Sequence, residues 1–151
     1  MKKNIYKILW ETLISDDSAL WERTAFDITS ESFWSKAELL PKGDKFVGSV
    51  IDGKPKGKGY LRTAENAVFA GVFKDGKLDG IGRHVFSDGG SDYCYVGEFR
   101  DGEYCGYGVL TVTDILNVTT FEGEFRDGKR VHGVCTVEDS DKGNVKSVSE
   151  Y

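Results

Sequence analysis

The chain has 151 residues, of which 30% are charged, and its formal net charge at pH 7 is −5. This length suits one domain, and the acidic balance disfavours nucleic acid and anionic membranes, which attract basic surfaces. No apolar run is long enough to span a bilayer, and Cys94, Cys105 and Cys135 lack metal-ligand spacing, which indicates reduced thiols in a cytoplasmic protein.

Residues 1–45 are predicted to form a small helical region. Apolar residues between positions 5 and 13 share one helix face, and the serines and acids of 15–18 suit the start of a second helical turn. A third helical segment is expected from Glu31 to Leu40, because Pro41 then ends it. Basic residues before the first apolar run resemble a secretion signal, but charges interrupt that run, so secretion is not expected.

Residues 46–136 contain one pattern four times. In its second copy, Phe69, Gly71 and Phe73 alternate with other residues, which predicts a strand. Asp75-Gly76 then supplies the positive φ of a tight turn, and a returning strand is expected over Arg83–Phe86. The leading aromatic residue recurs at intervals of 23, 26 and 26 residues, as Phe46, Phe69, Tyr95 and Phe121. The turn pair recurs as Asp52-Gly53, Asp101-Gly102 and Asp127-Gly128. A lone hairpin is marginally stable, so the four hairpins are expected to stack edge to edge.

The third copy, Tyr95-Val-Gly-Glu-Phe-Arg-Asp-Gly102 followed by Gly106 and Gly108, resembles a MORN repeat. The resemblance implies a mainly β fold, in which stacked hairpins form an elongated, gently curved, single-layer antiparallel sheet. It also implies a scaffold or binding module, although some such arrays are joined to enzymes. The first copy departs from the pattern at Val50. In the fourth copy we expect one extra residue before Gly133, with Cys135 in place of the second glycine.

The two faces of the predicted sheet differ. The aromatic residues and the strand glycines share one face, where rings can lie over glycine backbone. The other face changes along the chain, from Val47 and Val72 in the first two copies to charged residues in the last two. We therefore expect residues 1–45, which hold Trp10, Trp21 and Trp34, to cover the first two copies; the alternatives are that they cap the sheet end or the aromatic face. The tryptophans are more simply core residues than a partner surface.

Residues 137–151 are predicted to form a polar turn and a last strand over Val145–Tyr151. Asp139 and Asp141 resemble part of a calcium loop, but the glutamate that an EF-hand needs further on is missing, so a solvated turn is favoured and no metal site is expected. The two histidines, His84 and His132, lie in different copies, and no catalytic motif is present. We therefore expect neither enzyme activity nor a cofactor.

The favoured function is a non-enzymatic interaction module that presents the polar sheet face to another protein, whose surface would be basic. A solvated face with cross-strand ion pairs is the simpler alternative for these residues. A narrower hypothesis is a neutralising protein of the immunity or antitoxin type. The predicted contacts are Glu98, Arg100, Tyr104, Tyr107, Glu122, Glu124 and Arg126. The alternative function is a small-ligand binder, for a nucleotide or metabolite, with a pocket at the helix–sheet junction built from Tyr60, Arg62, Arg83 and His84.

Overall fold

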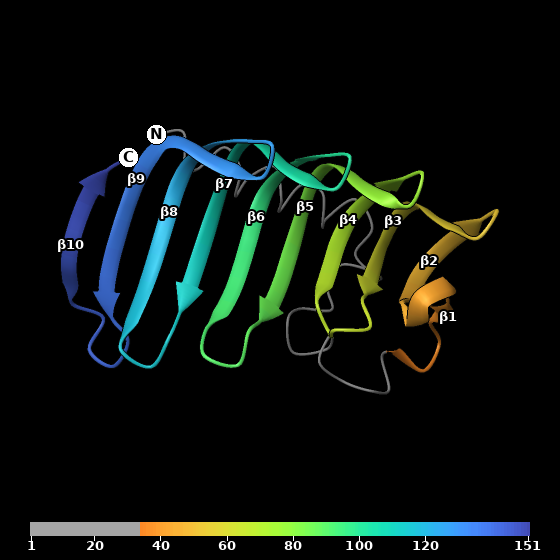
Figure 1. The fold of residues 1–151 in the computed structure, drawn as a ribbon, viewed down its shortest axis with the longest axis horizontal. Helices are drawn as coiled ribbons and strands as arrows, with labels where there is room; N and C mark the ends of the chain where they lie inside the picture. Colours follow the sequence, from red (N-terminus) through yellow and green to blue (C-terminus); the bar gives the residue numbers. More distant parts are fainter. Residues whose placement is uncertain (1–33) are drawn as a thin grey trace.

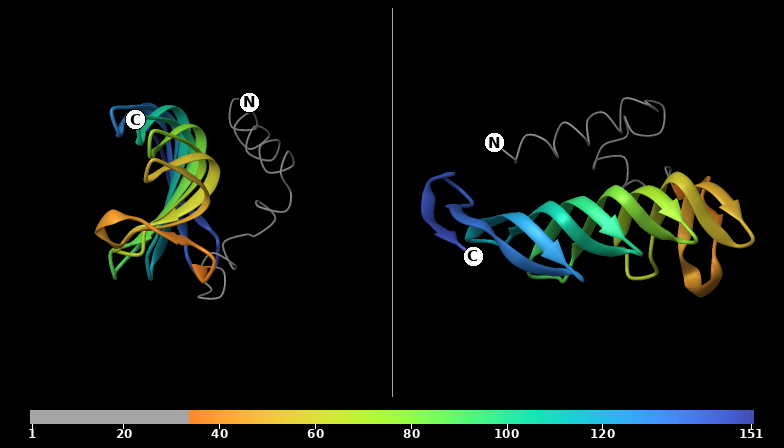
Figure 2. Two further views of the ribbon diagram at one scale, coloured as in Figure 1. Left: turned by 90° about the vertical axis from the view of Figure 1, so that its right-hand side faces the viewer. Right: turned by 90° about the horizontal axis from the view of Figure 1, so that it is seen from above.

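The structure is a computed structural model, and it describes residues 34–151. These residues form one antiparallel sheet in which each of ten strands pairs with the next in the chain (Figure 1). The sheet is elongated and curved (Figure 2), so the predicted mainly β, single-layer fold is confirmed. The strands are β1 (Glu38–Leu39), β2 (Lys45–Ile51), β3 (Lys54–Arg62), β4 (Val68–Lys74), β5 (Lys77–Ser87), β6 (Asp92–Arg100), β7 (Glu103–Thr113), β8 (Asn117–Arg126), β9 (Lys129–Asp139) and β10 (Val145–Glu150).

Four two-residue turns join β2–β3, β4–β5, β6–β7 and β8–β9, and these are the hairpins of repeats one to four. Both residues of each turn have positive φ, for example 52° at Asp75 and 87° at Gly76, which matches the twist of the strands they join. The turn of one repeat also contacts the repeat before it. The N–H of Gly76 donates to the carbonyl of Pro55 at 3.1 Å, and that of Gly102 to Leu78 at 2.9 Å. Each repeat therefore holds the turn of the next one in place.

A row of paired glycines crosses the sheet from β2 to β9. Aromatic rings lie directly over it: a Cβ at Gly59 would collide with the ring of Phe46, and one at Gly108 with the ring of Tyr95. The rings and the glycines therefore fit together only because the glycines have no side chain. The row consists of Gly48, Gly59, Gly71, Gly82, Gly97, Gly108, Gly123 and Gly133.

The main core lies on the side of the sheet that carries these rings, which we call the aromatic face. Tyr95 is fully buried and makes edge-to-face contacts with Phe99 and Phe125, each at 5.1 Å between ring centroids. Such pairs add to the free energy of burying the rings. The core residues come from every hairpin, namely Phe46, Phe73, Leu78, Tyr95, Phe99, Phe121 and Phe125. One continuous core therefore holds the four repeats together.

The register of repeat four corrects one prediction. In the first three hairpins the returning strand carries two extra residues, as where Gly97 pairs with Gly108 but Glu98 pairs with Cys105. In the fourth, Gly123 pairs with Gly133, and the strand carries only one extra residue, Val131. Repeat four is thus one residue shorter than the other three, not one residue longer as expected, and Gly133 is itself the second glycine. The ring of Phe121, which would lie 2.9 Å from a Cβ at position 133, explains why this register is chosen.

The helix predicted from Glu31 to Leu40 is wrong over the part that the structure describes. Within 34–40, only Trp34 belongs to a helix, Ser35 and Lys36 form a turn, and Glu38–Leu39 form β1, which pairs with β2. Leu40 is extended, with φ −100° and ψ 167°, because a residue that precedes proline disfavours the helical region. The helical segments predicted before residue 34 lie outside the described residues.

Trp34 packs on the face opposite the aromatic face. Its side chain is 2% exposed and contacts a small cluster of Tyr60, Val68 and Ala70, with Ala37 beside it. Trp34 and Ala37 therefore cover apolar residues of the first two repeats. The wider prediction, that residues 1–45 act as one covering unit, concerns mainly residues outside 34–151 and stays a prediction.

Candidate functional site

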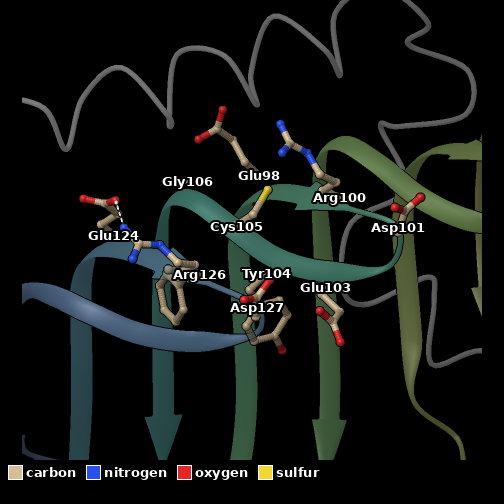
Figure 3. A pocket seen from close by; sticks show the side chains of 11 residues that line it. Glu98, Arg100, Asp101, Glu103, Tyr104, Cys105, Gly106, Glu124, Arg126 and Asp127 are labelled. Carbon is tan, nitrogen blue, oxygen red and sulfur yellow. Dashed lines mark ion pairs between the residues drawn. The ribbon is translucent and has the colours of Figure 1, made fainter.

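A hollow of about 370 Å³ lies between the turn ends of the third and fourth hairpins (Figure 3). Glu98, Arg100 and Cys105 project on one side of the ribbon, and Tyr104 projects on the other. We call the first side, over repeats three and four, the charged face. The hollow is lined by Glu98, Arg100, Asp101, Glu103, Tyr104, Cys105, Gly106, Glu124, Phe125, Arg126 and Asp127.

A second hollow of about 380 Å³ adjoins the first and shares Glu98, Gly106 and Glu124 with it. Its lining adds Tyr107, Glu122 and His132. The structure therefore brings together all seven residues that the sequence indicated, because each lines at least one of the two hollows. Six carboxylates and two guanidinium groups line them, so the surface is acidic overall.

Glu98 is held by the backbone of the bulge in β7. Its carboxylate accepts a hydrogen bond from the N–H of Tyr107 at 2.7 Å, and it occupies the position that a side chain at Gly106 would need. Gly106 has φ 58°, so glycine is required there for both reasons. The phenol of Tyr107 in turn donates to Glu122 at 3.2 Å. Glu98 therefore shapes the site as well as lining it.

Glu124 forms the exposed part of the charged face. Its carboxylate lies 3.8 Å from Arg126 Nη2 and 3.2 Å from His132 Nε2. The side chain of Glu124 is 39% exposed and those of its partners are about 70% exposed, so these ion pairs add little stability. His132 was not among the predicted contacts, because its place opposite Glu124 depends on the one-residue bulge of β9, which the sequence pattern did not reveal.

Tyr104 differs from the other predicted contacts because its ring belongs to the aromatic face. It stacks on Tyr95 with 3.7 Å between centroids, and its hydroxyl lies 2.6 Å from His84 Nδ1. Burial raises the pKa of the Tyr104 phenol and lowers that of His84 from 6.5 to about 4. A neutral His84 can therefore accept the phenol proton at Nδ1. Tyr104 therefore lines the first hollow from the side of the aromatic face.

The four residues proposed as a small-ligand pocket do not converge. Tyr60 is buried under Trp34, and the Arg62 guanidinium lies 5.1 Å from the centre of the Trp34 ring. Arg83 shares that face, because it pairs with Ala70. His84 lies on the aromatic face, stacked 4.0 Å from Phe69. The prediction is wrong in including His84, because neighbouring residues of one strand, such as Arg83 and His84, point to opposite faces; ligand binding by the other three stays a prediction.

Residues 34–151 contain no group of three or more His, Cys, Asp or Glu side chains arranged to hold a metal ion. Within the same residues, no helix has the length and apolar character needed to cross a membrane.

Comparison with known families gives one match. The family model described as MORN repeat matches residues 69–91, 95–114 and 121–142, which are repeats two, three and four. Repeat one lies outside the matched ranges, but its hairpin has the same paired glycines and the same two-residue bulge as the next two. A comparison with curated proteins finds no match.

Proposed function

This chain is a MORN-repeat protein, and on that premise we propose that it is a non-enzymatic interaction module whose charged face binds a partner protein. MORN repeats are generally interaction modules. The observation that carries the proposal is the pair of adjoining hollows, whose linings together include six carboxylates. A partner with basic side chains at its contact surface would complement this charge, which favours rapid and selective association.

The acidic surface and the small size of the chain also support a narrower form of this proposal. A neutralising protein of the immunity or antitoxin type needs to cover one basic surface of its target, and the two hollows offer carboxylates at a fixed spacing on a rigid sheet. The three cysteines form no disulfide, which supports a reducing compartment and hence a cytoplasmic location. A target enzyme would then be inhibited in proportion to the amount of complex formed.

The test begins with a pull-down from the native host and continues with purified partner. Glu103→Gln, Glu122→Gln and Glu124→Gln are combined, and Glu98 is left intact because it holds the bulge. We expect the variant to keep its fold and to bind the partner at least about tenfold more weakly at low ionic strength. The matched control removes three exposed carboxylates outside the hollows, Glu38, Glu65 and Glu150, by the same change to Gln.

The control has the same net charge as the test variant. Equal affinity loss in both would mean that only overall charge matters, and unchanged affinity in the test variant would exclude the charged face as the binding surface. A partner whose activity is unaffected by the wild-type chain, despite tight binding, would contradict the neutralising role while leaving the interaction module intact.

A further inference from the structure

The net charge of −5 conceals two halves of opposite sign. Residues 34–87, which contain the first two repeats, have ten basic and six acidic residues, a net charge of +4. Residues 88–151 have six basic and thirteen acidic residues, a net charge of −7. Because the strands follow one another in chain order across the sheet, this asymmetry is also an asymmetry in space. One end of the sheet is basic and the other is acidic.

The basic charge gathers on one face at the turn ends of the first two hairpins. The face that carries Val47 and Val72 also carries three lysines of β3, namely Lys54, Lys56 and Lys58. In the second hairpin, Lys74 lies directly opposite Lys77. The second turn adjoins the first, because the Cβ of Lys54 lies 3.8 Å from the Cβ position of Gly76. We call this set the lysine patch: Lys54, Lys56, Lys58, Lys74 and Lys77.

Within residues 34–151, the five lysines of the patch outnumber the three carboxylates of the same turns and strands, Asp52, Asp75 and Asp79. None of the ion pairs formed there includes any of these five lysines, and four of the five side chains are exposed. Like charges directly opposite each other, as at Lys74 and Lys77, destabilise a hairpin. The same two positions of the third hairpin hold residues of opposite charge, Arg100 and Glu103. The patch therefore retains an unfavourable charge pair that a single substitution would remove.

The size of the patch limits what can bind it. Three adjacent strands span about 10 Å, and Lys54 to Lys58 span about 13 Å along β3. An extended peptide of four to five residues, at about 3.3 Å per residue, covers that length. A membrane surface or a nucleic acid duplex is much larger than the patch, so it would also meet the acidic half of the same sheet and be repelled there.

We propose that the lysine patch is a second docking surface, which binds an extended acidic segment of a partner protein. It is separate from the charged face, whose carboxylates would repel such a segment. The molecule would then bind two partners, or two parts of one partner, of opposite charge. Whether the charged face functions as proposed does not decide this inference, because the two surfaces share no residue.

The test uses fluorescein-labelled hexaglutamate and the full chain, measured by fluorescence anisotropy. The test variant is Lys54→Gln with Lys77→Gln. The matched control is Lys129→Gln with Lys142→Gln, which removes two exposed lysines from the acidic half and gives the same net charge. We expect the wild type and the control to bind the peptide alike, and the test variant to bind about fivefold more weakly or worse, with all binding lost in about 0.5 M salt.

Three results would overturn the proposal. They are no binding of hexaglutamate to the wild type at low salt, an equal loss of affinity in the test variant and its control, and stronger binding to mixed phosphatidylcholine–phosphatidylserine vesicles than to the peptide. The last result would assign the patch to a lipid surface. Melting curves of both variants show whether a loss of binding comes from unfolding; substitution of exposed lysines is expected to leave the melting temperature nearly unchanged.

Discussion

Glu98 shows how one residue can serve both the fold and the surface. The sequence indicated a binding contact, and the structure adds a hydrogen bond from the N–H of Tyr107 that closes the bulge of β7. A half-buried N–H left without an acceptor costs about 1–3 kcal/mol, whereas an exposed ion pair such as that of Glu124 is worth about 0–1 kcal/mol. The two carboxylates are therefore expected to differ in their effect on stability.

We predict that Glu98→Ala lowers the free energy of unfolding by about 1–3 kcal/mol, and that Glu124→Ala changes it by no more than about 0.5 kcal/mol. Glu98→Gln keeps an acceptor oxygen and should recover most of the loss. Urea denaturation of the three variants measures these differences. Equal stability of the two alanine variants would show that the Tyr107 N–H finds another acceptor.

His84 provides a second prediction at the residue scale. Its pKa falls from 6.5 to about 4 on folding because the ring is buried, so between these pH values the unfolded chain binds more protons than the folded one. The stability contributed by neutral His84 is complete above pH 6.5 and is lost as the pH falls towards 4. The loss is on the order of 2–3 kcal/mol.

The measurement compares the pH dependence of stability in the wild type and in His84→Phe, in which a ring still stacks on Phe69. The slope of stability against pH between 4 and 6.5 should be smaller in the variant, while carboxylates contribute equally to both proteins. Identical slopes in the two proteins would contradict the assigned burial of His84.

At the scale of elements, each hairpin turn requires two consecutive residues with positive φ. Gly76 and Gly102 have φ of 87° and 82°, and each also donates its N–H to the preceding repeat. Gly90 lies in the loop between β5 and β6 without a positive φ, and a Cβ there would meet only Asp88 Oδ1 at 3.7 Å. Gly90 therefore has room for a side chain, whereas Gly76 and Gly102 cannot accept one without backbone strain.

We predict that Gly76→Val and Gly102→Val each cost more than about 1 kcal/mol, because valine is strained at positive φ. Gly90→Val should stay within about 0.5 kcal/mol of the wild type. Thermal melts of the three variants compare them directly. Melting temperatures that do not separate the turn glycines from Gly90 would argue against the turn assignment.

At the scale of the whole molecule, the sheet depends on what covers its first two repeats. Trp34 covers Tyr60, Val68 and Ala70, and β1 occupies the edge of β2. Without them, an apolar cluster and a strand edge would both be open, and such a combination favours aggregation.

We therefore predict that deletion of residues 1–40 causes aggregation, and that Trp34→Ala in the full chain lowers stability by about 3–5 kcal/mol. Light scattering and chemical denaturation measure the two effects. A truncated chain that remains monomeric and unfolds cooperatively would show that these residues are a separate appendage. In that case Trp34→Ala would also leave the free energy of unfolding nearly unchanged.

The sequence by itself determined the repeat, the turns and the antiparallel arrangement of the strands, because these depend on local chemistry. An Asp-Gly pair between two strand patterns readily adopts the positive φ of a tight hairpin turn, and alternating aromatic and glycine residues share a face in any strand. For the same reason, the change from valines to carboxylates along one face predicted that Glu98, Glu122 and Glu124 would lie together. The lysine patch was equally present in the sequence, but the net charge of the whole chain concealed it.

Only the tertiary structure decided the features that depend on pairing between strands. The bulge length of repeat four is fixed by Gly133 meeting Gly123 under the ring of Phe121, and counting residues after the turn could not reveal it. The region before Pro41 had a helical pattern, yet β1 forms because the edge of β2 offers backbone partners. Arg83 and His84 are neighbours in sequence, but the pleat of β5 places them on opposite faces, Arg83 opposite Ala70 and His84 stacked on Phe69.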